Sequence, residues 1–201
     1  MGATLPVIVP LDTGVASATV EQTIAVYGAS QSVPGDGYYE AAVLCGRLLA
    51  EAGFSVATGG YGGSMEAVSL GARSAGGHVV GVTAPSVFPK RSGANSHVVT
   101  ETPARSLVER IGLLAESTAG SIALWGSLGT AAELLVAWNL AYVAPLASLT
   151  PKPLIAVGEP WTSLVPLLES ALDTSPGIVT VVSDVSEAVD ELVRHLAGAQ
   201  H

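Results

Sequence analysis

Two glycine-rich segments contain the residues best suited to bind an anion. Residues 58–66 have the sequence TGGYGGSME, and residues 125–133 have the sequence WGSLGTAAE. Each segment follows a short apolar run that predicts a buried strand, and each leads into a helical pattern. At such a junction the unpaired backbone N–H groups and the positive end of the helix dipole face the same point. Two such junctions in one small domain predict a site for a phosphorylated ligand.

Several residues of these segments are candidate ligand contacts, together with a serine that follows the first predicted strand. They are Ser30, Gly59, Gly60, Gly62, Gly63, Met65, Gly126, Ser127, Leu128, Gly129 and Thr130. Neither segment has the pattern G-x-G-x-x-G or the Gly-Lys-Ser/Thr of a P-loop, which disfavours NAD binding and ATP hydrolysis. The glycines could alternatively serve only as tight turns, and Thr130 could cap its helix as well as bind a phosphate.

One acidic and one basic residue near these segments are candidates for chemistry. Glu133 lies one turn into its predicted helix among apolar neighbours, where an unpaired carboxylate would be costly. It must therefore pair with a cation, cap a backbone group or act on a ligand. Glu66 has the matching place in the first segment. Arg110 borders the apolar face of an earlier helix, and the alternative is a surface arginine paired with Glu109 or Glu116.

Strand and helix patterns alternate along the chain from residue 23. Apolar runs predict strands at 23–28, 54–58, 78–83, 120–125, 153–157 and 178–183, and helical patterns lie at about 37–52, 63–76, 105–118, 130–144, 161–173 and 185–197. This alternation predicts one α/β domain, 23–201, with a doubly wound parallel sheet and helices on both faces. Residues 1–22 have no clear period and are interpreted as an N-terminal extension, either a tail or an added edge strand. The ligand of such a sheet lies at the carboxyl ends of the strands, where both glycine segments would meet.

The composition argues against several classes of binding partner and bound group. The net charge of −9 over 201 residues repels a nucleic-acid backbone, so we expect no DNA or RNA binding. The single cysteine and the four histidines, which lack metal-ligand spacing, predict no disulfide and no metal site. We see no apolar run of bilayer length and no basic region before the apolar N-terminal residues, which predicts a cytoplasmic protein without a membrane partner. The unpatterned stretch 84–104 is a candidate flap over the site.

Taken together, these residues resemble a known signature. Glu109-Arg110 followed by W-G-S-L-G-T-x-x-E at 125–133 is similar to the Glu-Arg-Lys and Pro-Gly-Gly-x-Gly-Thr-x-x-Glu motifs of the lonely guy family, once mislabelled lysine decarboxylases. The resemblance covers about 23–197. It implies a Rossmann-like nucleotide-binding domain, a homodimer, and hydrolysis of a nucleoside 5′-monophosphate such as AMP to free base and ribose 5-phosphate. Arg110 and Glu133 fall on the catalytic positions, and no cofactor is implied.

The sequence departs from this signature at several positions. Trp125 replaces the proline, Ser127 the second glycine and Ile111 the lysine, and Glu66 stands where the family usually has glycine. The form of the first loop, with Glu66 at this position, resembles an uncharacterised branch that includes proteins considered nucleotide carriers, for example molybdenum-cofactor carriers. The resemblance as a whole still makes a phosphoribohydrolase the main hypothesis. In this hypothesis a phosphate lies on 126–130 and the base lies near Ser30 and Met65. The alternatives are a non-catalytic nucleotide-binding or cofactor-carrier protein, and a structural oligomer with an inherited pocket.

Overall fold

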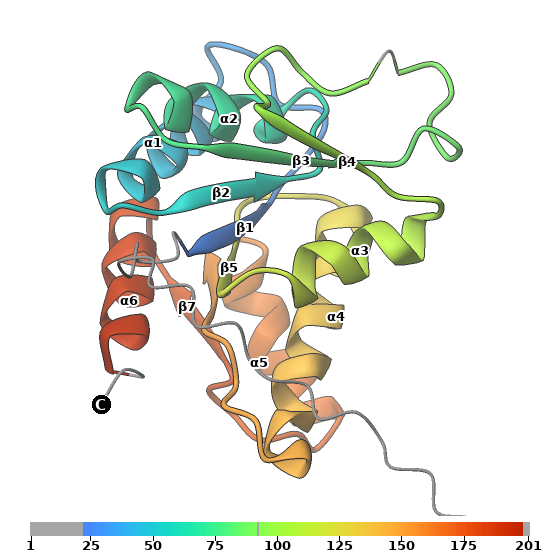
Figure 1. The fold of residues 1–201 in the computed structure, drawn as a ribbon. Coiled ribbons are helices and arrows are strands. Elements are labelled where there is room, and N and C mark those ends of the chain that lie inside the picture. The colour runs from blue at the N-terminus through green and yellow to red at the C-terminus, as the bar shows by residue number, and fades with distance from the viewer. Residues whose placement is uncertain (1–21, 92, 199–201) are drawn as a thin grey trace, which may run out of the picture.

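Seven parallel strands form one sheet in the order β4-β3-β2-β1-β5-β6-β7, as Figure 1 shows for this computed structural model. The structure describes residues 22–91 and 93–198, so the predicted extension 1–22 lies, apart from Gln22, outside the described residues. The strands are β1 (Thr23–Tyr27), β2 (Ser55–Thr58), β3 (Val79–Thr83), β4 (Thr100–Pro103), β5 (Gly120–Ala123), β6 (Leu154–Val157) and β7 (Val179–Val182). The single Rossmann-like α/β domain expected from the sequence is confirmed.

Six α-helices of the described residues cover the two faces of this sheet. They are α1 (Gly37–Glu51), α2 (Ser64–Ser74), α3 (Leu107–Glu116), α4 (Leu128–Val143), α5 (Trp161–Ala171) and α6 (Val185–Gly198), and the 3₁₀-helix η1 (Ala144–Ala147) follows α4. Helices α1, α2 and α6 lie on one face, and α3, α4 and α5 lie on the other (Figure 1). Ile24 and Val26 of β1 join the first core, whereas Ala25 and Tyr27 join the second. This alternation is the period of two that a strand covered on both faces requires.

The order of the strands reverses at β1, which pairs with β2 on one side and with β5 on the other. The segments that follow β1 and β5 are linked directly, because the N–H of Ala29 donates a hydrogen bond to the carbonyl oxygen of Trp125. The reversal creates a crevice at the carboxyl ends of the strands, which is the usual ligand site of such sheets. Both glycine loops lie at this edge.

One strand was missed by the sequence patterns. The stretch 84–104, expected to have no regular structure, contains the edge strand β4, which pairs with β3 from Thr100 to Pro103. Its sequence is Thr-Glu-Thr-Pro, and it is largely exposed. An edge strand with an exposed face needs no apolar run, and proline is tolerated there because one side of the strand is unpaired.

Helix α4 with η1 forms an apolar stretch that the sequence analysis did not identify. Leu128–Ala147 has the length of a membrane span and a mean hydropathy of 1.3. Leu134, Trp138 and Ala141 of this stretch are nevertheless buried in the core shared with the sheet, and the helix carries Glu133. This side of the helix therefore packs in the core of the α/β domain.

Candidate functional site

A cavity of about 210 Å³ opens at the carboxyl ends of the strands, where the sequence predicts the ligand. Its walls come from the segments after β1, β2 and β3 and from helices α3 and α4. The predicted site residues that line it are Ser30, Gly59, Met65, Arg110, Ser127, Gly129, Thr130 and Glu133. The other predicted contacts, which do not line it, are Gly60, Gly62, Gly63, Gly126 and Leu128.

Arg110 and Glu133 form an ion pair in the wall of this cavity. Nη1 of Arg110 lies 3.2 Å from Oε1 of Glu133, and the two side chains are only 8% and 10% exposed. Arg110 Nε also donates to the carbonyl oxygen of Val82 at 2.8 Å, which fixes the plane of the guanidinium group. The alternative of a surface arginine paired with Glu109 or Glu116 is wrong, because Arg110 is buried and its ion pair is with Glu133.

Burial changes the titration of both partners of this pair. It raises the pKa of Glu133 to about 7, although the attraction of Arg110 and its hydrogen bond act in the opposite direction. Burial also lowers the pKa of Arg110, which the Glu133 charge partly restores. Glu133 can therefore exchange a proton near neutral pH, as a general acid or base must.

Several glycines of the two loops are required by the structure itself. A Cβ atom at Gly59 would lie 1.6 Å from Nη2 of Arg110, so the absence of a side chain lets the guanidinium group lie against the backbone. Gly63 has a φ of +73°, and its Cβ would lie 2.5 Å from the carbonyl oxygen of Ala29. These positions fit the alternative interpretation of the glycines as tight turns.

Gly62 and Gly129 have no such structural reason. Neither has a positive φ, and a Cβ at Gly129 would meet no atom within 4 Å. A Cβ at Gly62 would meet only Glu66 Oε2, at an ordinary 3.9 Å. A glycine inside a helix is unfavourable relative to alanine, yet Gly129 lies in the first turn of α4. A glycine that the fold does not require, with empty space beside it, lets a ligand approach the backbone closely.

The helices that follow the two glycine loops also begin without side-chain caps. Asp36 caps α1 by accepting a hydrogen bond from the N–H of Tyr39, and Ser106 caps α3 by accepting one from the N–H of Glu109. At α4 the side chain of Ser127 makes no capping hydrogen bond, and α2 begins after Gly63. The N–H of Ser64 at the start of α2 donates to the carbonyl oxygen of Ala29. Among the described residues, the first N–H groups of α4 have no such partner, which leaves them for water or a ligand.

Three further residues lie at this cavity and were not predicted from the sequence. Phe88 and Arg91 line it, and the ring of Tyr61 lies beside both. They come from the first glycine loop and from the stretch 84–99, which has no hydrophobic period. The only sequence feature that could have indicated them is the basic side chain of Arg91, which lies in a long loop near a glycine segment.

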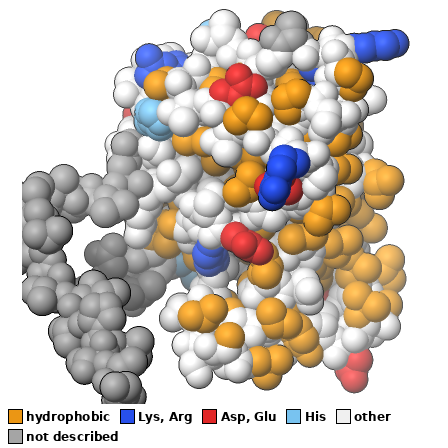
Figure 2. All heavy atoms as spheres, turned by 45° about the vertical axis from the view of Figure 1, so that its right-hand side comes forward, with side chains coloured by type: hydrophobic (Ala, Val, Ile, Leu, Met, Phe, Trp, Pro, Cys, Tyr) orange, Lys and Arg blue, Asp and Glu red, His pale blue; other side chains and the backbone are white. Residues whose placement is uncertain are grey.

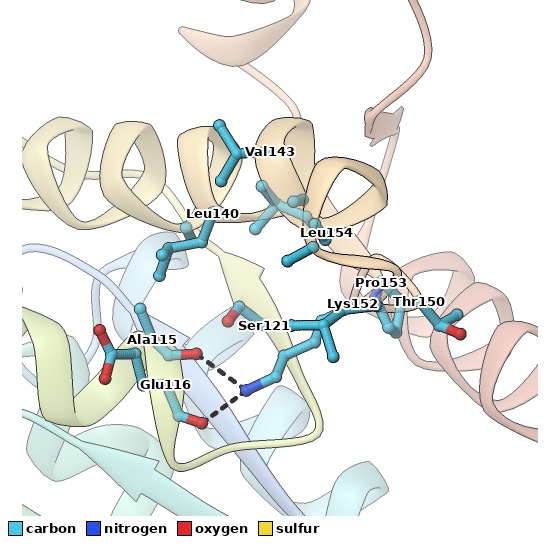
Figure 3. A pocket seen from close by; sticks show the side chains of 14 residues that line it. Ala115, Glu116, Ser121, Leu140, Val143, Thr150, Lys152, Pro153 and Leu154 are labelled. Atoms are coloured by element: carbon cyan, nitrogen blue, oxygen red, sulfur yellow. Dashed lines mark hydrogen bonds between the residues drawn. The ribbon is translucent and has the colours of Figure 1, made fainter.

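A larger cavity, of about 400 Å³, lies at the other end of α4 (Figure 3). Leu140, Val143 and Leu154 give it apolar walls, and Lys152 donates hydrogen bonds to the carbonyl oxygens of Ala115 and Glu116 at the end of α3. None of the predicted site residues lines it. The smaller cavity is the better candidate site, because it brings the ion pair and the glycine loops together.

Comparison with solved structures identifies similar folds. The chain is 23% identical to a molybdenum cofactor binding protein from the phototrophic bacterium Rippkaea orientalis, with a TM-score of 0.70 over 90% of this chain and 99% of that one. It is 25% identical to the molybdenum cofactor carrier protein of Chlamydomonas reinhardtii, with a TM-score of 0.68 over 88% and 99% of the two chains. The structure of TM1055 is 24% identical and has a TM-score of 0.67, over 86% of this chain and 99% of that one.

Sequence comparison gives a family assignment. No curated protein sequence matches the chain significantly. The profile of the SLOG cluster4 family matches residues 21–161, which include both glycine loops and the pair Arg110–Glu133. Of the expected resemblance to the lonely guy family, the comparisons show a Rossmann-like nucleotide-binding fold, which molybdenum cofactor carriers share. The chain belongs to the SLOG cluster4 family.

Proposed function

We propose that the protein binds a nucleotide or a phosphorylated cofactor in the cavity beside Arg110 and Glu133 and carries it without cleaving it. The observation that carries the proposal is the empty space at Gly129, in the first turn of a helix that no side chain caps. There a phosphate would accept hydrogen bonds from backbone N–H groups and from the hydroxyl of Thr130. A heterocyclic base or ring would lie toward Ser30 and Met65, which line the same cavity.

Three observations favour a carrier over a hydrolase. Glu133 is held by Arg110, so one of its oxygens is already engaged. The chain also lacks the proline, the second glycine and the lysine of the lonely guy signature, having Trp125, Ser127 and Ile111 instead. Full-length likeness to structures named as molybdenum cofactor carriers supports the same choice.

Hydrolysis of a nucleoside 5′-monophosphate is the second candidate function, and one observation favours it. Glu133 lines the cavity with a pKa of about 7, which suits a group that activates water near neutral pH. Cleavage of an N-glycosidic bond passes through an oxocarbenium-like state, which a carboxylate beside C1′ stabilises. Arg110 would then hold Glu133 or the sugar phosphate in place.

We also propose that the protein is a homodimer and acts in the cytoplasm. Figure 2 shows apolar side chains gathered over the face that carries α3 and α4, and Val108, Leu135 and Val136 of these helices are exposed. Exposed apolar side chains on neighbouring helices are typical of an interface between subunits. A protein with a net charge of −9 is not expected to use this face for nucleic acid.

Incubation with AMP separates the two candidate functions. Equilibrium dialysis measures bound AMP, and chromatography of the same sample measures adenine and ribose 5-phosphate. Binding with full recovery of AMP supports the carrier. Release of adenine supports the hydrolase, provided that Glu133→Gln lowers turnover by roughly 10²–10⁴-fold, the contribution of a general acid or base. If AMP is neither bound nor cleaved, both candidate functions are contradicted.

A further inference from the structure

Arg91, which the sequence analysis did not assign, lines the candidate cavity from the loop between β3 and β4. Its guanidinium carbon lies 4.5 Å from the centre of the Tyr61 ring and 4.6 Å from the centre of the Phe88 ring. The two rings pack edge to face, with centroids 5.6 Å apart. Attraction between a cation and aromatic faces therefore holds the guanidinium group of Arg91 at the cavity.

The aromatic residues that hold Arg91 are themselves fixed. The hydroxyl oxygen of Tyr61 accepts a hydrogen bond of 2.8 Å from the N–H of Ala84, at the start of the loop. Near the end of the loop, the side-chain amide of Asn95 donates to the carbonyl oxygens of Gly60 and Tyr61. The loop is thus fastened to the first glycine segment at two points. A side chain ordered before binding has less conformational entropy to lose when a ligand arrives.

No carboxylate of the described residues forms an ion pair with Arg91. The arginine–carboxylate ion pairs within 22–91 and 93–198 are Arg105–Glu109, Arg110–Glu133 and Arg194–Glu191. Two guanidinium groups therefore line the cavity against one carboxylate, that of Glu133. Burial lowers the pKa of Arg110, and the charge of Arg91 lowers it further, so the two cations are close enough to interact. An excess of positive charge in a cavity of an acidic protein favours an anionic ligand.

We propose that Arg91 binds a second anionic group of the ligand, in addition to the phosphate at the N-terminus of α4. The ligand class is then a nucleotide or phosphorylated cofactor with at least two anionic groups. The chemistry suits an arginine, because its guanidinium carbon lies over the rings of Tyr61 and Phe88 while its N–H groups can donate two parallel hydrogen bonds to a phosphate. This inference rests on the proposed function, since it concerns the same cavity.

Calorimetric titration with three probes tests the inference: AMP, ADP and adenosine 3′,5′-bisphosphate. The wild-type protein should bind ADP or adenosine 3′,5′-bisphosphate about tenfold or more tightly than AMP, because a hydrogen bond to a charged group contributes roughly that factor. Arg91→Gln should abolish this preference, and Arg91→Lys should retain part of it. Arg105→Gln is the matched control, since Arg105 pairs with Glu109 and does not line the cavity.

The outcomes distinguish this inference from the proposed function. If AMP binds but neither bisphosphorylated probe binds more tightly, or if the preference survives in Arg91→Gln, the role of Arg91 is wrong and the proposed function stands. If none of the three probes binds, both are wrong. A melting curve of each variant confirms that it is folded, and the lysine variant keeps the charge if glutamine disturbs the packing on Tyr61 and Phe88.

Discussion

Arg110 occupies the space that a side chain at Gly59 would need. A Cβ atom at Gly59 would lie 1.6 Å from Nη2 of Arg110 and 2.6 Å from the sulfur of Met65. The glycine at the end of β2 thus lets the guanidinium group reach both the carbonyl oxygen of Val82 and the carboxylate of Glu133. Gly59, which lines the cavity as a predicted ligand contact, thus also makes room for the charged pair beside it.

Substitution Gly59→Ala should displace Arg110 and leave Glu133 buried without its partner. We expect the free energy of unfolding to fall by about 1–3 kcal/mol, the cost of an unsatisfied buried polar group. Gly112→Ala is the control, because a Cβ at Gly112 in α3 would meet no atom within 4 Å and should stabilise the helix slightly. Urea denaturation measures both variants. Equal stability of Gly59→Ala and the wild type would show that the pair does not depend on this glycine.

Substitution Gly129→Ala should separate stability from binding. Because a Cβ has room there, the unliganded protein should gain up to about 1 kcal/mol of stability. The same methyl group fills the space proposed for the phosphate, so the affinity for AMP should fall by roughly tenfold or more. Gly112→Ala should gain similar stability with unchanged affinity. Unchanged AMP binding by Gly129→Ala would place the phosphate elsewhere.

The raised pKa of Glu133 predicts a pH dependence of stability. Between its ordinary value of 4.5 and about 7, the folded state holds a proton that the unfolded state releases. The wild type should therefore lose stability relative to Glu133→Gln as pH rises through this range, by up to about 3 kcal/mol, and the difference should be constant above it. Urea denaturation at several pH values measures this. A difference that does not change with pH would mean that Glu133 has an ordinary pKa.

The proposed dimer gives a prediction on assembly. Light scattering at micromolar concentration should give the mass of two chains, and Leu135→Glu on the exposed side of α4 should give a monomer. Val193→Glu is the control, because Val193 is also exposed but lies on α6, on the opposite face of the sheet (Figure 1). A monomeric wild type, or a dimer that tolerates Leu135→Glu, would rule out an interface through α4.

The regular elements were predictable because both faces of the sheet are buried. The predicted strands and helices agree within two residues with the structure, apart from β4, since strands covered on both faces are apolar throughout. The strand β4 gave no such signal, because its sequence is polar and its position is at the edge. Helix α4 was predicted, but the sequence patterns did not show that α4 and η1 together form one long apolar stretch.

The site was predictable only in part. Arg110 and Glu133 were chosen as a pair because of a family resemblance. The structure places the two side chains together in the cavity wall. The cluster of Tyr61, Phe88 and Arg91 could not be predicted, because it joins two loops that have no period. The sequence also could not separate Gly59, which makes room for Arg110, from Gly129, which has empty space beside it.

Comparison of AMP with adenosine in a thermal melt tests the central claim most directly. The two compounds differ only in the phosphate, which we place on the backbone N–H groups at the start of α4. A ligand that binds only the folded state raises the melting temperature by mass action. We predict a clear rise with AMP and a much smaller rise with adenosine at the same concentration. Equal shifts, or no shift with either compound, would contradict a phosphate site in this cavity.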